Sequence, residues 1–194
     1  MDLLIISGHK FYGPKGIGAL YVRRGIEIES LIVGGVQENK MRAGTENVLA
    51  ISGLGKAAEL AVRRLSRMKS VRELRDILEE GIRKIIPATK LNGYPDVRLP
   101  NTLNMTLPEM RGESVVLALD HKGVAISSGS ACRAGSPEPS HALTAMGLTD
   151  KEAHCALRFS LGLGNTKDEV KRTLIIFEEV VKESKTIVRF VPCR

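Results

Sequence analysis

A long stretch with a helical pattern, from about Thr45 to Ile85, constrains this 194-residue chain more than any other feature. Apolar residues recur along it at steps of three and four, which is the pattern of an amphipathic helix. Pro87 ends the pattern, because proline cannot continue a helix. A pattern of this length is typical of two helices or of one bent helix. We therefore expect a domain boundary inside it.

The segments on either side of the helical stretch differ in kind. Before it, residues 2–6 and 17–22 are apolar, rich in β-branched side chains and bounded by glycines, which predicts two short buried strands. After it, strands and helices alternate. The expected elements are strands at 102–107, 124–126 and 156–161, and helices at 113–121, 141–146 and 167–183. The order of these elements predicts an α/β or α+β fold.

Composition excludes several classes of protein. Hydrophobic residues make up 43% and charged residues 26%, as in ordinary globular proteins. No apolar run is long enough to span a bilayer, and Met1-Asp2 leads directly into a strand without a signal peptide. Three cysteines without CxxC spacing argue against a disulfide framework and against a structural zinc site. We expect a cytoplasmic protein with no metal.

The basic balance of the chain raises the question of an acidic partner. The net charge is +7, which is compatible with nucleic-acid binding. However, aromatic residues make up only 4% and tryptophan is absent, which argues against a surface for base stacking. The basic residues between Lys56 and Lys90 also alternate with acidic ones, as on a solvated helix face. We expect neither nucleic acid nor a membrane as a partner.

The segment between the first two predicted strands holds chemically useful side chains. It carries a hydroxyl, an imidazole and an amine at Ser7, His9 and Lys10, followed by a turn rich in glycine and proline. A desolvated lysine can lose its proton and form a Schiff base, and the neighbouring groups can hold a phosphate. The alternative is a loop with two solvated lysines. Taken alone, the segment favours this alternative.

Two further residues are candidates for chemistry. Cys132 lies in a loop of small residues beside Arg133, and an exposed thiol next to a cation tends toward the reactive thiolate. This favours a functional cysteine, whereas Cys155 and Cys193 are interpreted as structural or incidental. Arg158 lies in an otherwise apolar strand end, and its planar guanidinium suits a carboxylate. A surface arginine on an edge strand is an equally good interpretation.

Considered together, several motifs resemble one family. In chain order they are SGHKFYGPKG (7–16), MRAGTEN (41–47), SSGSAC (127–132), EPSH (138–141) and RFSLG (158–162). Their order and spacing closely resemble the NifS/IscS-type cysteine desulfurases, which are pyridoxal phosphate (PLP) enzymes of the class V aminotransferase family. The resemblance covers essentially the whole chain, but only the C-terminal half of the family's length.

The resemblance implies the fold and the cofactor. The expected fold is PLP-dependent transferase fold type I, like that of aspartate aminotransferase. Residues 1–66 would form the C-terminal part of the PLP-binding large domain and the start of the linking helix, and residues 67–194 the α+β small domain with the catalytic cysteine loop. Lys10 matches the lysine that forms a Schiff base with PLP, and Ser7 and His9 match phosphate-binding residues. Thr45 matches a threonine that reaches the cofactor of the neighbouring subunit, which implies a homodimer.

The resemblance also implies the reaction. Cys132 matches the cysteine that attacks the sulfur of L-cysteine and becomes a persulfide, and Arg158 matches the arginine that holds the substrate carboxylate. The products would be L-alanine and sulfur for iron–sulfur cluster assembly or other transfer, through a scaffold or another acceptor protein. Selenocysteine lyase activity and a non-catalytic module that docks such a scaffold are the alternatives. The family's ring-stacking histidine and the aspartate that pairs with the pyridine nitrogen belong to the other half, so we expect the isolated chain to be inactive.

Overall fold

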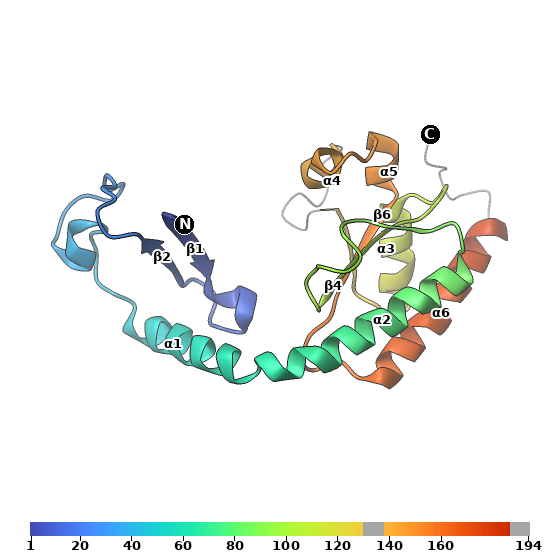
Figure 1. Cartoon of the computed structure of the whole chain (residues 1–194), viewed down its shortest axis with the longest axis horizontal. Coiled ribbons are helices and arrows are strands. Elements are labelled where there is room, and N and C mark those ends of the chain that lie inside the picture. The colour runs from blue at the N-terminus through green and yellow to red at the C-terminus, as the bar shows by residue number, and fades with distance from the viewer. Residues whose placement is uncertain (130–137, 187–194) are drawn as a thin grey trace. The chain divides into compact units, whose positions relative to one another are not determined.

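The computed structural model describes residues 1–129 and 138–186 of the chain (Figure 1). Contacts divide the chain into two compact units, Met1–Ser66 and Arg67–Arg194, which we call unit 1 and unit 2.

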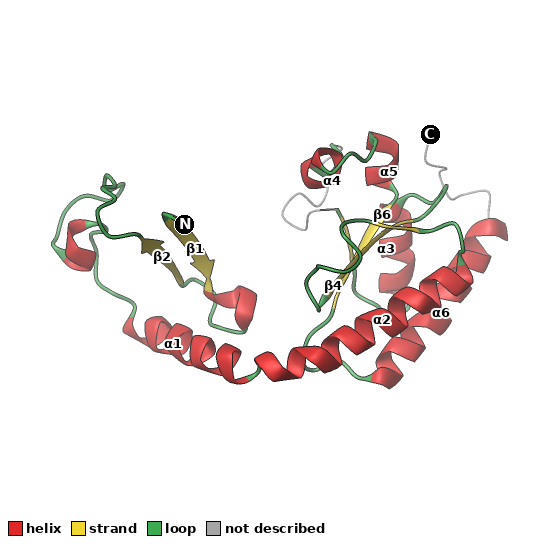
Figure 2. Cartoon of the chain, in the orientation of Figure 1, coloured by secondary structure: helices red, strands yellow, loops and turns green. Residues whose placement is uncertain are grey.

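Unit 1 contains a two-stranded antiparallel ribbon and one long helix (Figure 2). Strand β1 (Leu3–Ser7) pairs with β2 (Gly18–Val22), and the short 3-10 helix η1 (Gly8–Phe11) lies in the connection between them. A second 3-10 helix, η2 (Gln37–Lys40), precedes helix α1 (Val48–Arg63). The two strands therefore occur where the sequence predicts them, whereas η2 was not expected.

The prediction that these strands are buried is wrong. Both faces of the ribbon are exposed, and the Ile5 side chain is 80% accessible to solvent. Successive strand residues point to opposite faces, and here both faces are apolar. This composition is typical of strands that are covered on both sides. In the described part of unit 1, however, the buried residues are only Gly8, Ala50 and Ala57, so no layer covers either face.

The long helical stretch is two helices. Helix α1 begins after Asn47, whose side-chain oxygen accepts a hydrogen bond from the Ala50 amide at 3.1 Å. It ends at Arg63, and the 3-10 helix η3 (Leu65–Arg67) leads into α2 (Met68–Ile85). The stop before Pro87 agrees with the sequence, and the start lies a few residues later than predicted.

Unit 2 is built on a four-stranded antiparallel sheet. The strand order is β3 (Lys90–Leu91), β4 (Thr102–Thr106), β6 (Ala156–Ser160) and β5 (Ser127–Ser128). A strand predicted at 124–126 is wrong, because the pairing residues are Ser127, opposite Arg158, and Ser128, opposite Leu157. The apolar side chains of Val124 and Ile126 instead pack against the core from the segment before β5.

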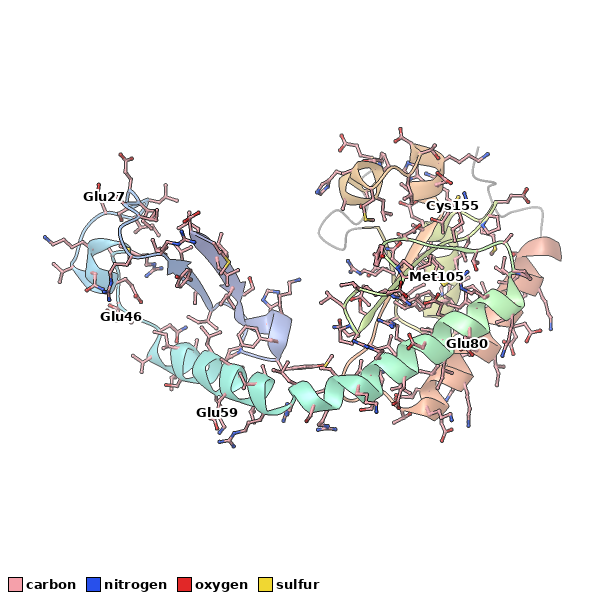
Figure 3. All side chains as sticks on the ribbon, viewed as in Figure 1. Glu27, Glu46, Glu59, Glu80, Met105 and Cys155 are labelled. Atoms are coloured by element: carbon pink, nitrogen blue, oxygen red, sulfur yellow. The ribbon has the colours of Figure 1, made fainter. Side chains whose placement is uncertain are left out.

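Three helices cover one face of this sheet. Helices α2, α3 (Gly112–His121) and α6 (Lys167–Thr186) pack against β4 and β6 through one continuous apolar cluster. Phe159 of β6 meets Phe177 of α6 edge-to-face, with ring centroids 6.4 Å apart, and Met105 of β4 lies in the same interior (Figure 3). Other fully buried members are Ile82, Leu103, Leu107, Val115, Leu119, Leu157 and Val180.

Two short helices pack together at the end of the sheet where β6 begins. Helix α4 (His141–Ala145) matches the prediction, whereas α5 (Asp150–His154) was not predicted. Thr149 and Glu152 form a capping box at the start of α5, with each side chain bonded to the other residue's backbone amide. Cys155, which follows α5, is buried and disulfide-bonded, which corrects the expectation from cysteine spacing.

No helix in residues 1–129 or 138–186 is long and apolar enough to cross a membrane. Over the same ranges, no group of three or more histidine, cysteine, aspartate or glutamate side chains is arranged to hold a metal ion.

Candidate functional site

The loop that carries Lys10 is tightly built. The amide of Gly8 donates to the Ile17 carbonyl, and the amide of Gly13 donates to the Gly8 carbonyl, each at 2.9 Å. A Cβ atom on Gly8 would lie 2.9 Å from the Ile17 side chain, and one on Gly13 would lie 2.8 Å from the Gly8 oxygen. Both positions therefore require glycine, and together they fix the place of Lys10 on η1.

Three polar groups lie in sequence at this loop. Ser7 ends β1 and is half-buried, and its hydroxyl does not cap η1. His9 and Lys10 are exposed on η1. The desolvated lysine of the sequence interpretation is therefore not found in the structure, because the described residues do not bury this amine. A hydroxyl, an imidazole and an amine remain available to an anionic ligand with a phosphate group.

Thr45 belongs to the same unit. It is exposed and lies in the irregular segment between η2 and α1, two residues before the capping Asn47. The loop after η1 packs directly on α1, where a Cβ atom on Gly53 would lie 2.6 Å from the Pro14 ring. Unit 1 thus holds all the predicted cofactor-binding residues, which are Ser7, His9, Lys10 and Thr45.

Arg158 occupies the centre of the sheet in unit 2. It lies on β6, directly opposite Asn104 of β4 on one side and Ser127 of β5 on the other. Residues directly opposite each other in a sheet project from the same face. All three are half-buried, and they lie on the face opposite the helices, because their neighbours Leu103, Leu157 and Phe159 belong to the core. We call these three residues the polar row.

The guanidinium of Arg158 lacks an internal acceptor at one position. Its Nε atom is buried and makes no hydrogen bond to the part of the chain that the structure describes. A buried donor without a partner is costly, and a charged one more so. The arrangement therefore fits an anion bound from outside the chain, and a carboxylate matches the fork of the guanidinium.

A hydrogen-bonded network beside Arg158 was not predicted from the sequence. Asn92 Nδ2 donates to Asn104 Oδ1 at 2.7 Å and to Thr106 Oγ1 at 2.9 Å. The Thr106 hydroxyl also lies 3.4 Å from the Glu152 carbonyl oxygen. The alternation of residues 102–107 already placed Asn104 and Thr106 on the polar face, so the signal was present.

Cys132 lies outside the described residues, as do its neighbours from 130 to 137. The described segment that leads to it ends in β5 and Gly129, which has a φ of 61°. The strand pairing of β5 with β6 places Ser127 opposite Arg158.

Comparison with known proteins identifies the family. Residues 1–173 match the family model described as "Aminotransferase class-V". The chain is 49% identical over 193 residues to "Cysteine desulfurase IscS" of Methanosarcina thermophila, which covers 99% of this chain and 48% of that protein. A solved NifS-like protein from Rickettsia africae is 34% identical with a TM-score of 0.84, over 94% of this chain and 48% of the other. The structure titled "SspA in complex with cysteine" is 37% identical with a TM-score of 0.56, over 83% and 44% of the two chains.

The fold and the matched residues define a member of the class V aminotransferases, and the chain belongs to this family. Within the family, its similarity is to the NifS/IscS-type cysteine desulfurases. The chain spans about half the length of the curated relatives it matches.

Proposed function

We propose that the chain is the C-terminal portion of a PLP-dependent cysteine desulfurase. The observation that supports this most directly is Arg158, whose buried Nε lacks a partner in the centre of the polar row. A carboxylate-bearing substrate satisfies that donor. The similarity to proteins named cysteine desulfurase indicates that this substrate is L-cysteine. A solved relative is titled as a complex with cysteine.

The residues of unit 1 fit the cofactor. Lys10 presents an exposed amine on a loop fixed by two glycines, with Ser7 and His9 beside it to bind a phosphate. When bound there, PLP supplies an electron sink for the substrate carbon skeleton. Lys10 holds the cofactor and moves protons, and Thr45 reaches the cofactor of a second copy in a homodimer. In this proposal residues 1–66 are the end of the large domain, and residues 67–194 are the small domain.

Cys132 is the proposed sulfur acceptor. Its thiolate attacks the sulfur of L-cysteine, the carbon–sulfur bond breaks, and the carbon takes up a proton to give L-alanine. The sulfur atom remains on Cys132 as a persulfide, so atoms and electrons balance without a further reactant. A protein acceptor, such as an iron–sulfur scaffold, then removes this sulfur.

Cofactor binding is the first test. The purified chain is incubated with PLP and desalted, its absorption spectrum is recorded, and the bound cofactor is fixed with borohydride before mass spectrometry. We expect the mass increase on the peptide that contains Lys10, with none in the Lys10→Ala variant. Lys15→Ala is the matched control in the same loop and should label normally. If the wild-type chain keeps no cofactor, the proposal that these residues alone hold PLP is wrong, and a non-catalytic scaffold-docking module becomes the better interpretation.

Persulfide formation is the second test. Because the isolated chain is expected to be inactive, the test uses a PLP-loaded fusion of this chain with the N-terminal half of a cysteine desulfurase relative. The fusion is treated with L-cysteine, and the thiols are labelled and mapped by mass spectrometry. The added sulfur is expected on Cys132 and should be lost in Cys132→Ala, whereas Cys193→Ala should leave it unchanged. Sulfur transfer that persists in Cys132→Ala would remove the proposed role of this residue. A large preference for selenocysteine over L-cysteine would assign the alternative lyase activity.

A further inference from the structure

We propose that Asn104 is a second donor for the substrate carboxylate, beside Arg158. This inference rests on the proposed function, because it assigns one more residue to the same carboxylate. It depends on two observations in unit 2, which are the strand register that places the two side chains together and the hydrogen bonds that fix the direction of the Asn104 amide.

The register makes the two residues neighbours. Asn104 and Arg158 are direct partners between β4 and β6, so their Cβ atoms are about 4.5–5.5 Å apart on the same face. Both side chains are half-buried, and neither belongs to the apolar core. A group held by the guanidinium of Arg158 on this face therefore lies within reach of the Asn104 amide.

Neighbouring hydrogen bonds determine which end of that amide faces Arg158. Asn92 Nδ2 donates to Thr106 Oγ1 at 2.9 Å, and the Thr106 hydroxyl has two acceptors within reach, Asn92 Oδ1 at 3.2 Å and the Glu152 carbonyl at 3.4 Å. The same Asn92 nitrogen lies 2.7 Å from Asn104, which must therefore present its oxygen to Asn92. The Asn104 NH₂ group points away from this network and has no hydrogen-bond partner among the described side chains and backbone.

This orientation keeps the Asn104 oxygen away from Arg158. With the amide reversed, its oxygen would be available as an internal acceptor for the guanidinium, yet Arg158 Nε remains without a partner. The polar row thus presents donors from two adjacent strands and no carboxylate of its own. A carboxylate has about four acceptor sites, enough to take the fork of Arg158 together with one N–H of Asn104.

The test uses nuclear magnetic resonance on the ¹⁵N-labelled chain, in which the Arg158 Nε–H and Asn104 Nδ2–H₂ signals are both visible. L-alanine is the probe, since it carries the carboxylate and cannot donate sulfur, and ethylamine is the control without a carboxylate. We expect both signals to shift with L-alanine along one saturation curve and to stay in place with ethylamine. A shift of the Arg158 signal without any response from Asn104 would overturn the inference.

Variants separate this inference from the proposed function. Asn104→Asp should weaken L-alanine binding by about tenfold or more, because a hydrogen bond to a charged group is lost. Asn104→Ala should also weaken L-alanine binding. It keeps the test usable if the Asn104→Asp variant does not fold. Asn101→Asp makes the same chemical change just before β4 and should bind like the wild type. If Arg158→Gln abolishes binding while both Asn104 variants bind normally, only the inference fails. If the Arg158→Gln variant also binds L-alanine normally, the proposed carboxylate-binding role of Arg158 is wrong as well as the inference about Asn104.

Discussion

Unit 1 and unit 2 hold their candidate functional residues on very different supports. Unit 2 holds Arg158 on a sheet backed by three helices and a continuous apolar core. Unit 1 holds Lys10 on a ribbon whose two faces are both exposed. The difference shows that local geometry can be well defined without a core, because the hydrogen bonds and glycines of the Lys10 loop are short-range.

The largest expected effect is on hydrogen exchange. Amides of β4 and β6 should exchange only on global opening of unit 2, whereas those of β1 and β2 should exchange through local opening. We expect protection factors that differ by about a thousandfold or more, measured by exchange and mass spectrometry at neutral pH. Equal protection of the two regions would mean that another layer covers the ribbon in solution. The contrast between a covered sheet in unit 2 and an exposed ribbon in unit 1 would then be wrong.

A matched pair of core substitutions comes next. Ile82 of α2 is 0% exposed, so Ile82→Ala should lower the free energy of unfolding by about 2–5 kcal/mol. Ile5 of β1 is 80% exposed, so Ile5→Ala should change it by no more than about 0.5 kcal/mol. Denaturant unfolding followed by circular dichroism measures both. A cost at Ile5 similar to that at Ile82 would contradict the exposed ribbon.

A matched pair of charge substitutions tests the same contrast. Glu79 of α2 has a side chain only 14% exposed and accepts hydrogen bonds from Arg83 and Arg98, whose own side chain is 16% exposed. Glu79→Gln should cost about 2–4 kcal/mol, because it removes the nearest carboxylate from the Arg98 charge and leaves only Asp76, at 4.0 Å.

The corresponding residue in unit 1 is Glu59 of α1, which points away from the helix (Figure 3). It pairs with Lys56 at 2.9 Å and with Arg63, and its side chain is 41% exposed. Glu59→Gln should cost about 0–1 kcal/mol, as for other surface ion pairs. The same unfolding measurement applies, and a loss at Glu59 equal to that at Glu79 would show that exposure does not separate the two units.

The smallest expected effect is on acid stability in unit 2. Lys90 bonds to Glu152 at 2.8 Å, and together with the capping bonds from Thr149 it lowers the pKa of Glu152 from 4.5 to about 2. Because the folded-state pKa is the lower one, this stabilisation is present above pH 4.5 and is lost as the pH falls toward 2.

The variant Lys90→Met should move the pKa of Glu152 back up, as measured by titration of its side-chain carbon signal. Glu169 is the internal control, because its pKa is lowered mainly by the backbone amide of Thr166 and should not respond. An unchanged pKa of Glu152 in the variant would show that the capping box alone holds it down.

Strands and helices with clear periodicity could be predicted from the sequence. The alternation of Thr102–Thr106 and the apolar stripe of α6 both led to elements that the structure confirms. The short strand β5 could not be found this way, because its position is set by pairing with Arg158 and Leu157 rather than by apolar content. The T-x-x-E pattern that begins at Thr149 is the sequence signal for the start of α5.

The candidate site was predictable in part. The Lys10 motif and Arg158 were identified from residue types and spacing, whereas Asn104 depends on a register between strands far apart in the sequence. The predicted burial of β1 and β2 is wrong. An apolar composition is typical of strands that are covered on both faces, but it does not show whether other elements of the chain cover them. Whether a side chain has a partner, as for Arg158 Nε, is also invisible in a sequence.

The β1–β2 ribbon has a further consequence for how the protein behaves at high concentration. Each strand pairs only with the other within the part of the chain that the structure describes, so both outer edges present unpaired backbone N–H and C=O groups. Open edges next to apolar side chains are templates on which another strand can add. The ribbon is therefore the place where copies of this chain would join edge to edge, and a strand supplied in trans, or a charged residue placed on an edge, is the natural means of keeping them apart.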